Sequence, residues 1–279
     1  MILGEPAFSV QPSHQAPRDD SPFLCFDGGR VLLADTDGGA PAIPTLAQAR
    51  PLPDGTEPFE LAHTDRFALF CPHPFQGGQV PERAGLRYHP LHIFRSLPYA
   101  EAGLLVSCWH LWTWYGRNRF CGRCAYPLVP DASERALRCE RCGLVIYPAI
   151  APAVIVAITR GDSILLARSV RSTFRHHSLI SGYVEVGETL EHAVRREVME
   201  EVGLRVKNIR FYKSQPWSFS NSVLIGFFCD LDGSDEITVD TNELSEAVWV
   251  ERSDIPAESR GGNSLTEEMM QLFRVGKEK

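Results

Sequence analysis

Short apolar runs bounded by turn residues mark the strands of this chain. The runs FLCF at 23–26 and RVLLAD at 30–35 flank Asp27-Gly28-Gly29, and this arrangement predicts a β-hairpin. Further strands are predicted at residues 66–72, 153–158, 163–169, 205–215, 222–231 and 246–251. Strands are therefore expected in both halves of the chain.

Three other segments carry apolar residues at helical spacing. In residues 99–115 the apolar positions are Leu104, Leu105, Cys108, Leu111, Trp112 and Tyr115. This spacing predicts a buried amphipathic helix. Two more helices are predicted at residues 189–202 and 265–274.

The sequence pattern changes twice, which predicts three domains. Residues 1–116 are expected to form a small N-terminal α/β domain. Residues 117–150 hold four closely spaced cysteines, and residues 151–279 combine new strands with an acidic helix.

Composition and charge narrow the classes of function. The chain has 279 residues and a net charge of −7, which argues against a general polyanion binder because such affinity rests on many Lys and Arg contacts to phosphate. Every apolar run is shorter than the roughly 20 residues of a membrane-spanning helix, and the N-terminus lacks the basic start and apolar core of a secretory signal. A cytoplasmic protein without a membrane partner is therefore expected.

The four cysteines have the spacing of a metal site. Cys121 and Cys124 form one Cys-x2-Cys pair, and Cys139 and Cys142 form a second. Together two such pairs can surround one ion tetrahedrally, as in a zinc ribbon. Two disulfides are the alternative, but a cytosolic chain with this spacing favours zinc. One structural zinc per chain is expected, because four thiolates leave no open coordination position.

The helix predicted at 189–202 carries a cluster of carboxylates. Glu197, Glu200 and Glu201 are three and four residues apart and share one face. Carboxylates without nearby Cys or His suit Mg²⁺ or Mn²⁺, and Arg196 can pair with Glu188 or Glu200 to orient the cluster. The adjoining apolar strip that can bury against a sheet consists of Val194, Val198 and Val202.

The segment from Gly182 to Leu204 resembles the signature of the Nudix hydrolases. It follows the pattern Gly-x5-Glu-x7-Arg-Glu-apolar-x-Glu-Glu-x-Gly-apolar at every specified position. A solvated acidic face is the alternative for the helix alone, and the complete pattern favours the resemblance. The resemblance implies an α/β fold class, with a Nudix α/β/α sandwich and mixed sheet over 151–279 preceded by the zinc ribbon and the N-terminal α/β domain.

A second motif, SQPWSFSNS at 214–222, follows this signature, the Nudix box of residues 182–204. It resembles the Ser-Gln-Pro-Trp-Pro-Phe-Pro-x-Ser motif of the NADH pyrophosphatases within the Nudix superfamily, with Ser218 and Ser220 in place of the two later prolines. Aromatic rings stack on bases and small polar groups bind phosphate or ribose, so the loop is predicted to read a nucleotide. The alternative is that Trp217 and Phe219 close the core.

The resemblance implies individual site residues. The implied ligands of Mg²⁺ or Mn²⁺ are the Ser181 carbonyl, Glu197, Glu200, Glu201 and Glu243, with Glu246 competing for the last role. The implied substrate contacts are Glu134, Tyr147, Tyr183, Gln215, Pro216, Trp217, Ser218, Phe219, Ser220, Asn221 and Ser222. Because the family is homodimeric, Tyr147 is expected to serve the site of the other subunit.

The resemblance also implies a reaction. It is the metal-dependent hydrolysis of NADH, and less efficiently of NAD⁺, to nicotinamide mononucleotide and AMP, with NAD-capped RNA as a further substrate. Glu197, Glu200 and Glu201 are the implied catalytic residues, and Glu200 or Glu201 would accept the proton of the attacking water. Two alternatives stay open: a broad dinucleoside polyphosphate hydrolase and a non-catalytic Nudix module that senses a nucleotide.

Overall fold

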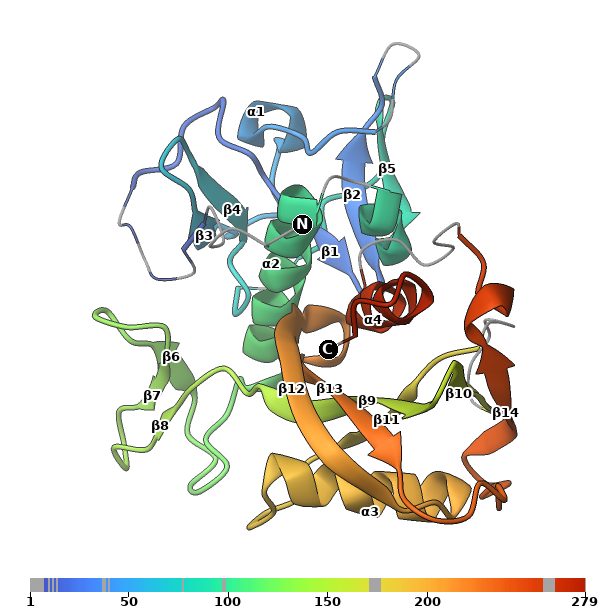
Figure 1. Cartoon of the computed structure of the whole chain (residues 1–279). Coiled ribbons are helices and arrows are strands. Elements are labelled where there is room, and N and C mark those ends of the chain that lie inside the picture. Colours follow the sequence, from blue (N-terminus) through green and yellow to red (C-terminus); the bar gives the residue numbers. More distant parts are fainter. Residues whose placement is uncertain are drawn as a thin grey trace. The chain divides into compact units, whose positions relative to one another are not determined.

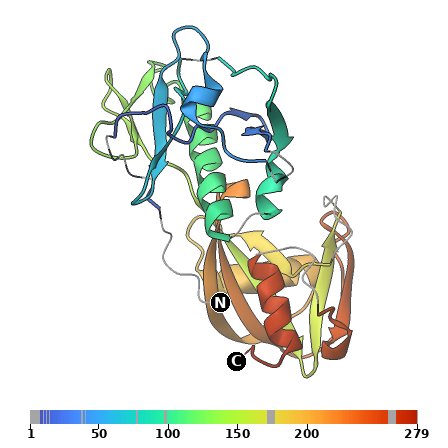
Figure 2. The ribbon, with the colours of Figure 1, turned by 90° about the horizontal axis from the view of Figure 1, so that it is seen from above.

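The computed structural model describes residues 8–9, 11, 13, 15–36, 39, 41–76, 78–96, 99–170, 177–257 and 264–278. The chain divides into two compact units, Met1–Ala149 and Ile150–Lys279 (Figure 1 and Figure 2). The four-cysteine segment belongs to the first unit. Within the described ranges, no helix combines the length and apolar character needed to span a membrane.

The first unit contains a three-stranded sheet of order β1-β2-β5 and a separate antiparallel pair, β3-β4. The predicted hairpin is confirmed, since Asp27 lies opposite Arg30 across the turn. Gly28 has a φ of 55°, a left-handed conformation that glycine adopts without steric cost. The strands are β1 (Phe26–Asp27), β2 (Arg30–Ala34), β3 (Pro58–His63), β4 (Ala68–Pro72) and β5 (Leu86–Pro90).

Helices complete the N-terminal part of this unit. They are α1 (Leu46–Ala49), the 3-10 helix η1 (Leu91–Ser96) and α2 (Tyr99–Arg117). Helix α2 confirms the helix predicted at 99–115, and all its predicted apolar positions except Trp112 are buried. The Trp112 ring instead packs against Phe26 with the two centroids 5.5 Å apart.

The cysteine segment folds into three short antiparallel strands of order β6-β7-β8, namely β6 (Leu128–Pro130), β7 (Leu137–Cys139) and β8 (Val145–Ile146). Arg135, which precedes β7, is buried. Its guanidinium donates to the carbonyls of Glu60 and Leu61 at 3.2 and 3.0 Å, and to the Tyr115 hydroxyl at 3.1 Å. These contacts tie the ribbon to β3 and α2, which explains why it groups with the N-terminal elements.

The second unit is a six-stranded mixed sheet of order β12-β13-β9-β10-β14, with β11 paired to β9. Strands β13 and β9 run parallel, while the remaining pairs are antiparallel. The strands are β9 (Ala151–Arg160), β10 (Ser163–Ser169), β11 (Ile180–Tyr183), β12 (Val206–Trp217), β13 (Ser222–Leu231) and β14 (Leu244–Glu251).

Two helices cover opposite faces of this sheet, as Figure 1 and Figure 2 show. Helix α3 (Leu190–Val202) packs on one face, and α4 (Leu265–Arg274) packs on the other. The 3-10 helices η2 (Ser218–Ser220) and η3 (Arg252–Asp254) follow β12 and β14. The predicted α/β/α arrangement with a mixed sheet is therefore confirmed.

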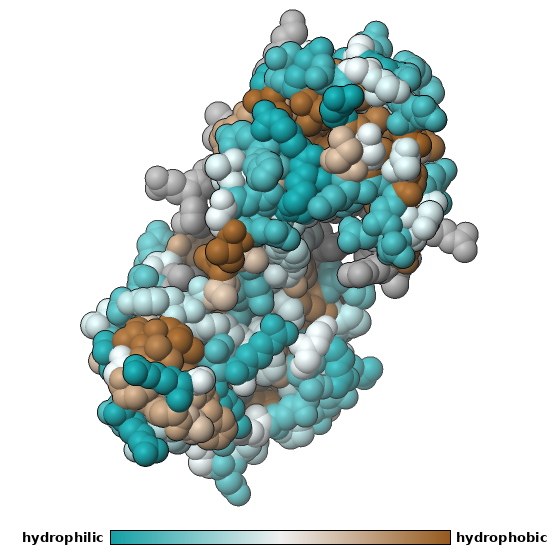
Figure 3. Space-filling model, turned by 90° about the horizontal axis from the view of Figure 1, so that it is seen from below, coloured by the Kyte–Doolittle hydropathy of each residue, from teal (hydrophilic) through white to brown (hydrophobic). Residues whose placement is uncertain are grey.

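Figure 3 shows one face of the molecule, on which hydrophobic residues lie in separate patches among hydrophilic ones. Large apolar side chains that are exposed include Phe120, Tyr147, Tyr183 and Phe211. They come from both units, so exposed aromatic surface is not confined to the motif at 214–222.

Candidate active site and metal centre

The four ribbon cysteines form a compact thiol cluster. All four Sγ atoms lie within 4.8 Å of one another, and each cysteine is free of disulfides. The Sγ atoms of Cys121 and Cys142 are 3.6 Å apart, and those of Cys124 and Cys139 are 3.5 Å apart. A disulfide requires about 2.05 Å, so the alternative of two disulfides does not fit, whereas a tetrahedral zinc site does.

Two similar turns present these thiols. In the first, the N–H of Ala125 donates to the Cys121 carbonyl at 2.8 Å, and in the second the N–H of Gly143 donates to the Cys139 carbonyl at 2.9 Å. Ala125 and Gly143 have φ values of 57° and 73°. The first turn therefore holds an alanine in a left-handed conformation that favours glycine.

Helix α3 carries the box glutamates and has well-defined ends. The side chain of Thr189 accepts from the N–H of His192 at the start, and Gly203 ends the helix with a φ of 69°. The predicted apolar strip is fully buried and consists of Val194, Val198 and Val202. Burial of this strip turns Glu197 and Glu201 toward the interior, while Glu200 remains exposed.

Glu197 lies directly over the first glycine of the box. A Cβ atom added to Gly182 would lie 1.8 Å from the Cδ atom of Glu197. Any side chain at Gly182 would displace this carboxylate. The close approach of Glu197 therefore explains why this position holds glycine. Ser181 precedes Gly182 in β11, so its carbonyl belongs to the same strand end.

Arg196 connects the carboxylates of the box. It donates to both oxygens of Glu188 at 2.8 Å, to Glu197 at 2.8 Å and to Glu200 at 3.0 Å. It also donates to the Tyr183 carbonyl at 2.9 Å. The bonds from Arg196 to Glu188, followed by the bond from the Glu185 N–H, lower the pKa of Glu188 to about 2. The predicted pairing of Arg196 is thus observed with both Glu188 and Glu200.

Glu201 is the least exposed of the three helix carboxylates, at 6 %. Burial, followed by the charges of Glu197, Glu243 and Asp240, raises its pKa to about 8. Burial likewise raises the pKa of Glu197, and Glu243 adds to that shift. A buried cluster of like charges that resists ionisation is an environment that a hard divalent cation would stabilise.

Glu243 and Glu246, the competing distant carboxylates, lie in different surroundings. The charge of Glu243 acts on both Glu197 and Glu201. Glu246 is instead engaged by Arg168 at 3.1 Å and by His177 at 3.2 Å. The electrostatics therefore favour Glu243 as the member of the cluster.

Asp240 is a residue that sequence reasoning missed. Its Oδ1 atom accepts from the backbone and side-chain nitrogens of Asn242 at 2.9 and 2.8 Å. Its carbonyl accepts from the N–H of Glu243 at 3.1 Å. Asp240 therefore shapes the turn that carries Glu243, and the sequence Asp-x-Asn before this glutamate was the available signal.

The motif at 214–222 forms the end of β12, the helix η2 and the start of β13. The rings of Trp217 and Phe219 pack with centroids 5.3 Å apart at an angle of 58°, and both side chains are half-buried. Neither ring lies in the core of the second unit. The loop thus keeps aromatic surface accessible, as recognition of a flat base requires.

Buried polar groups organise the end of this motif. The buried Ser222 hydroxyl lies 2.9 Å from that of Ser220 and 3.3 Å from that of Tyr183, which brings three predicted substrate contacts together. Asn221 adopts a φ of 55°, and its Oδ1 atom is buried without a hydrogen-bond partner. Pro216 and Ser220 are exposed, and Ser218 is half-buried.

The remaining predicted contacts lie in other surroundings. Glu134 and Tyr147 belong to the first unit, where the Tyr147 hydroxyl donates to Glu134 at 2.9 Å, and this bond raises the pKa of Tyr147. The side chain of Gln215 is only 2 % exposed, and its Oε1 atom accepts from the N–H of Leu265 at 2.7 Å. Gln215 therefore turns into the protein and not toward the loop surface.

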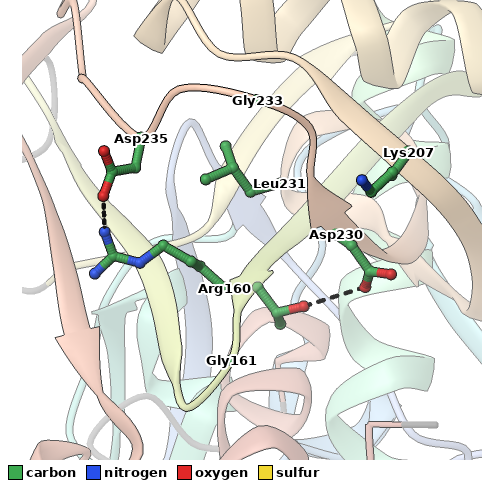
Figure 4. Close-up of a pocket in the computed structure, with 8 residues that line it drawn as sticks. Arg160, Gly161, Lys207, Asp230, Leu231, Gly233 and Asp235 are labelled. Atoms are coloured by element: carbon green, nitrogen blue, oxygen red, sulfur yellow. Dashed lines mark hydrogen bonds and ion pairs between the residues drawn. The ribbon is translucent and has the colours of Figure 1, made fainter.

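A hollow of about 600 Å³ lies elsewhere in the second unit, and Figure 4 shows its lining residues. It lies near the paired residues Thr159 and Asp230. The motif at 214–222 meets β9 at its other end, where Ser222 pairs with Ala151. Arg160 forms an ion pair with Asp235 in this hollow. The other charged lining residues are paired as well, Lys207 with Asp232 and Asp230 with Arg210, so the carboxylate cluster of α3 is the better candidate for chemistry.

Comparison with known proteins relates these features to families. Residues 149–273 match the family model described as the NUDIX domain, and residues 117–147 match that of the NADH pyrophosphatase zinc ribbon domain. The chain is 46% identical over 173 residues to the NAD-capped RNA hydrolase NudC of Salmonella heidelberg (strain SL476), covering 61% of this chain and 67% of that protein. The protein of that name from Salmonella typhi gives the same identity and coverage: 46%, 61% and 67%. A solved Nudix hydrolase from Nitrosomonas europaea gives a TM-score of 0.49 at 20% identity, covering 57% of this chain and 92% of that chain.

Proposed function

Because this chain belongs to the NAD-capped RNA hydrolases of the Nudix superfamily, we propose that it hydrolyses the pyrophosphate bond of NADH. NAD⁺ and the 5′ end of NAD-capped RNA, which contain the same linkage, are further proposed substrates. The products from NADH are reduced nicotinamide mononucleotide and AMP.

One observation carries this proposal: Glu197 and Glu201 are both buried on α3, and Arg196 donates to Glu197 but not to Glu201 among the bonds described for it. Two buried carboxylates on one helix are an environment that a divalent cation would stabilise. We propose Glu197, Glu200, Glu201, Glu243 and the Ser181 carbonyl as the groups that hold Mg²⁺ or Mn²⁺. When bound, such an ion would supply Lewis-acid chemistry: it would neutralise developing negative charge and lower the pKa of a water molecule.

The chain's own residues divide the remaining tasks. Arg196 holds Glu188, Glu197 and Glu200 in fixed positions through charge-assisted bonds. Glu200 or Glu201 would receive the proton of the attacking water. Trp217, Phe219 and Tyr183 would present aromatic surface to the two halves of the dinucleotide.

We also propose that the ribbon binds one structural zinc and that the protein works as a cytoplasmic homodimer in which Tyr147 serves the partner's site. The zinc proposal rests on the four clustered thiols. The dimer can be tested by mixing Tyr147→Ala and Glu201→Gln chains. Recovery of activity in the mixture supports sharing of the site, and additive loss contradicts it.

A substrate panel tests the proposed function. Purified protein with Mg²⁺ or Mn²⁺ is assayed on NADH, NAD⁺, diadenosine polyphosphates, ADP-ribose and NAD-capped RNA. We expect NADH or NAD-capped RNA to give the highest kcat/KM. Equal turnover of diadenosine polyphosphates would favour a broad hydrolase, and no turnover of any compound would favour a sensing module.

A further inference from the structure

Gln215 lies on the face of the sheet that α4 covers. It pairs with Leu224 across β12 and β13, and cross-strand partners share a face. Leu224 packs against the cluster that contains Leu265 and Met269 of α4. A polar side chain that is 2 % exposed on such a face needs a partner inside the protein.

Helix α4 comes close to the sheet at this point because β13 contains Gly226. A Cβ atom at Gly226 would lie 2.7 Å from the Met269 Sδ atom and 3.3 Å from the Leu265 Cδ2 atom. The first turn of a helix has N–H groups without helical partners. The close approach lets the N–H of Leu265, the first residue of α4, reach Gln215 Oε1 at 2.7 Å.

A second contact holds the same end of α4. The carboxylate of Glu268 accepts from the Tyr212 hydroxyl at 2.6 Å and from the Lys213 Nζ atom at 2.8 and 2.9 Å. The strand register shifts between Phe211 and Lys213, and this irregularity allows the consecutive Tyr212 and Lys213 to reach one carboxylate. The last part of β12 is thus attached to α4 by three side chains.

We propose that Gln215 is a positioning residue, which makes α4 the support that holds Trp217 and Phe219 in place for the dinucleotide. The proposal rests on the proposed function and deepens it. Gln215 precedes Trp217 by two residues in β12, so a shift of its side chain moves the strand end that carries the aromatic rings. Glu268 assists by fixing the same helix turn to β12.

Two substitutions distinguish positioning from substrate contact. Gln215→Met keeps the length of the side chain and removes the acceptor. Gln215→Glu keeps an oxygen acceptor, and the N-terminus of α4 stabilises its negative charge. Positioning therefore predicts a smaller loss in the Glu variant than in the Met variant. Direct contact with the substrate phosphates predicts the reverse order, because a carboxylate would repel them.

The readouts are KM and kcat for NADH, together with hydrogen exchange of the segment 214–222. Loss of a buried hydrogen bond should raise KM about 10-fold in Gln215→Met with kcat changed less than about 2-fold. Exchange of the segment should be faster in Gln215→Met than in Gln215→Glu. A small diphosphate substrate without a second nucleoside should be turned over by both variants as by wild type.

Several outcomes overturn the proposal. They are a Glu variant that is worse than the Met variant, equal losses on both substrates, or unchanged exchange in Gln215→Met. If Gln215→Met does not fold, Glu268→Gln supplies the comparison, and unchanged exchange and KM in that variant overturn the proposal equally. Wild-type turnover of NADH is measured in the same assay, so its absence would reject the proposed function separately.

Discussion

The ribbon thiols and the α3 carboxylates both gather groups that must lose protons to bind a metal, but the two clusters differ in construction. The four Sγ atoms lie within 4.8 Å of one another on short turns. In the described part of the chain, the carboxylates do not form a comparably tight group of ligand atoms. They are spread along a helix and a turn, and burial raises the pKa of Glu201 to about 8.

This difference separates a permanent metal site from an exchangeable one. The thiol cluster is complete in itself, and a closed tetrahedral site contributes directly to folding. The carboxylate cluster stores electrostatic repulsion that Arg196 relieves only in part. Oxygen ligands of this kind leave room for water and substrate phosphates around the ion.

Cys139→Ser should abolish zinc binding and unfold the ribbon, because structural zinc sites contribute on the order of 10 kcal/mol to folding. Zinc content is measured by elemental analysis after dialysis, and stability by thermal unfolding. Cys229→Ala is the matched control, since Cys229 is a buried cysteine of the second unit. Cys229→Ala should lower the Tm and leave the zinc content unchanged. Full zinc content in Cys139→Ser would contradict the assignment of this ligand.

Glu201→Gln should lower kcat by about 10²-fold or more, because it removes a proposed metal ligand or base. Zinc content should stay unchanged, which separates the two clusters. Glu191→Gln, at an exposed position of the same helix, is the control and should retain activity. Turnover of Glu201→Gln at the wild-type rate with saturating metal would reject the role of this residue.

Trp217→Ala should reduce kcat/KM for NADH by roughly 5- to 150-fold, since stacking on an aromatic ring contributes about 1–3 kcal/mol per base. A small diphosphate substrate should be affected far less. The ring is half-buried against Phe219, so a modest loss of stability is expected as well. Equal loss on both substrates together with a lower Tm would mean that the ring serves only packing.

In protein dialysed free of Mg²⁺ and Mn²⁺, the Tm should depend on pH through the protonation of Glu201. Its pKa is about 8 in the folded protein against an ordinary 4.5, so the folded state binds this proton more tightly. Stability is therefore lost as pH rises from 4.5 through 8. Above this range Glu201→Gln should melt at least about 2–4 °C higher than wild type.

The difference between Glu201→Gln and wild type should vanish near pH 4.5, the ordinary pKa of the carboxyl. It should also shrink when Mg²⁺ is added to the wild type, because bound cation stabilises the ionised form. A variant with the same Tm as wild type at every pH would contradict the raised pKa.

The smallest expected effect concerns the two ribbon turns. Ala125→Gly should stabilise the zinc-bound ribbon by about 0.5–1 kcal/mol, because it removes an alanine from a φ of 57°. Gly143→Ala should have the opposite effect, since a Cβ at Gly143 meets no neighbouring atom and only the backbone conformation opposes it. Zinc release to a chromogenic chelator measures both. Identical release rates would show that the turns tolerate alanine equally.

Local signals predicted the three long helices and most strands of the second unit, but they missed α1, β3, β5 and β11. Thr189 and Gly203 define α3 through hydrogen bonding and a left-handed backbone, and both effects act between near neighbours. Strand β13 has the bounds predicted from its apolar run. The side on which Gln215 lies could not be predicted, because the irregular register of β12 interrupts the alternation that a sequence pattern assumes.

Long-range contacts account for the features of the structure that the sequence did not predict. The grouping of the ribbon with the N-terminal elements depends on Arg135, whose partners Glu60 and Leu61 lie far away in sequence. In sequence, six arginines of residues 117–142 are equivalent charges, and only the fold reveals that this one is buried. The contribution of Asp240 likewise appears only once α3 and the turn before β14 lie together.

The Arg135 anchor determines how the ribbon can be handled as a building block. Excision of residues 117–147 for transfer to another protein would leave a guanidinium without the two carbonyls and the hydroxyl that satisfy it. The remaining N-terminal part would in turn lose the donor that Glu60 and Leu61 share. Although its four cysteines form a self-contained metal site, the ribbon is therefore not a portable module, and a transplant would have to carry β3 and α2 with it.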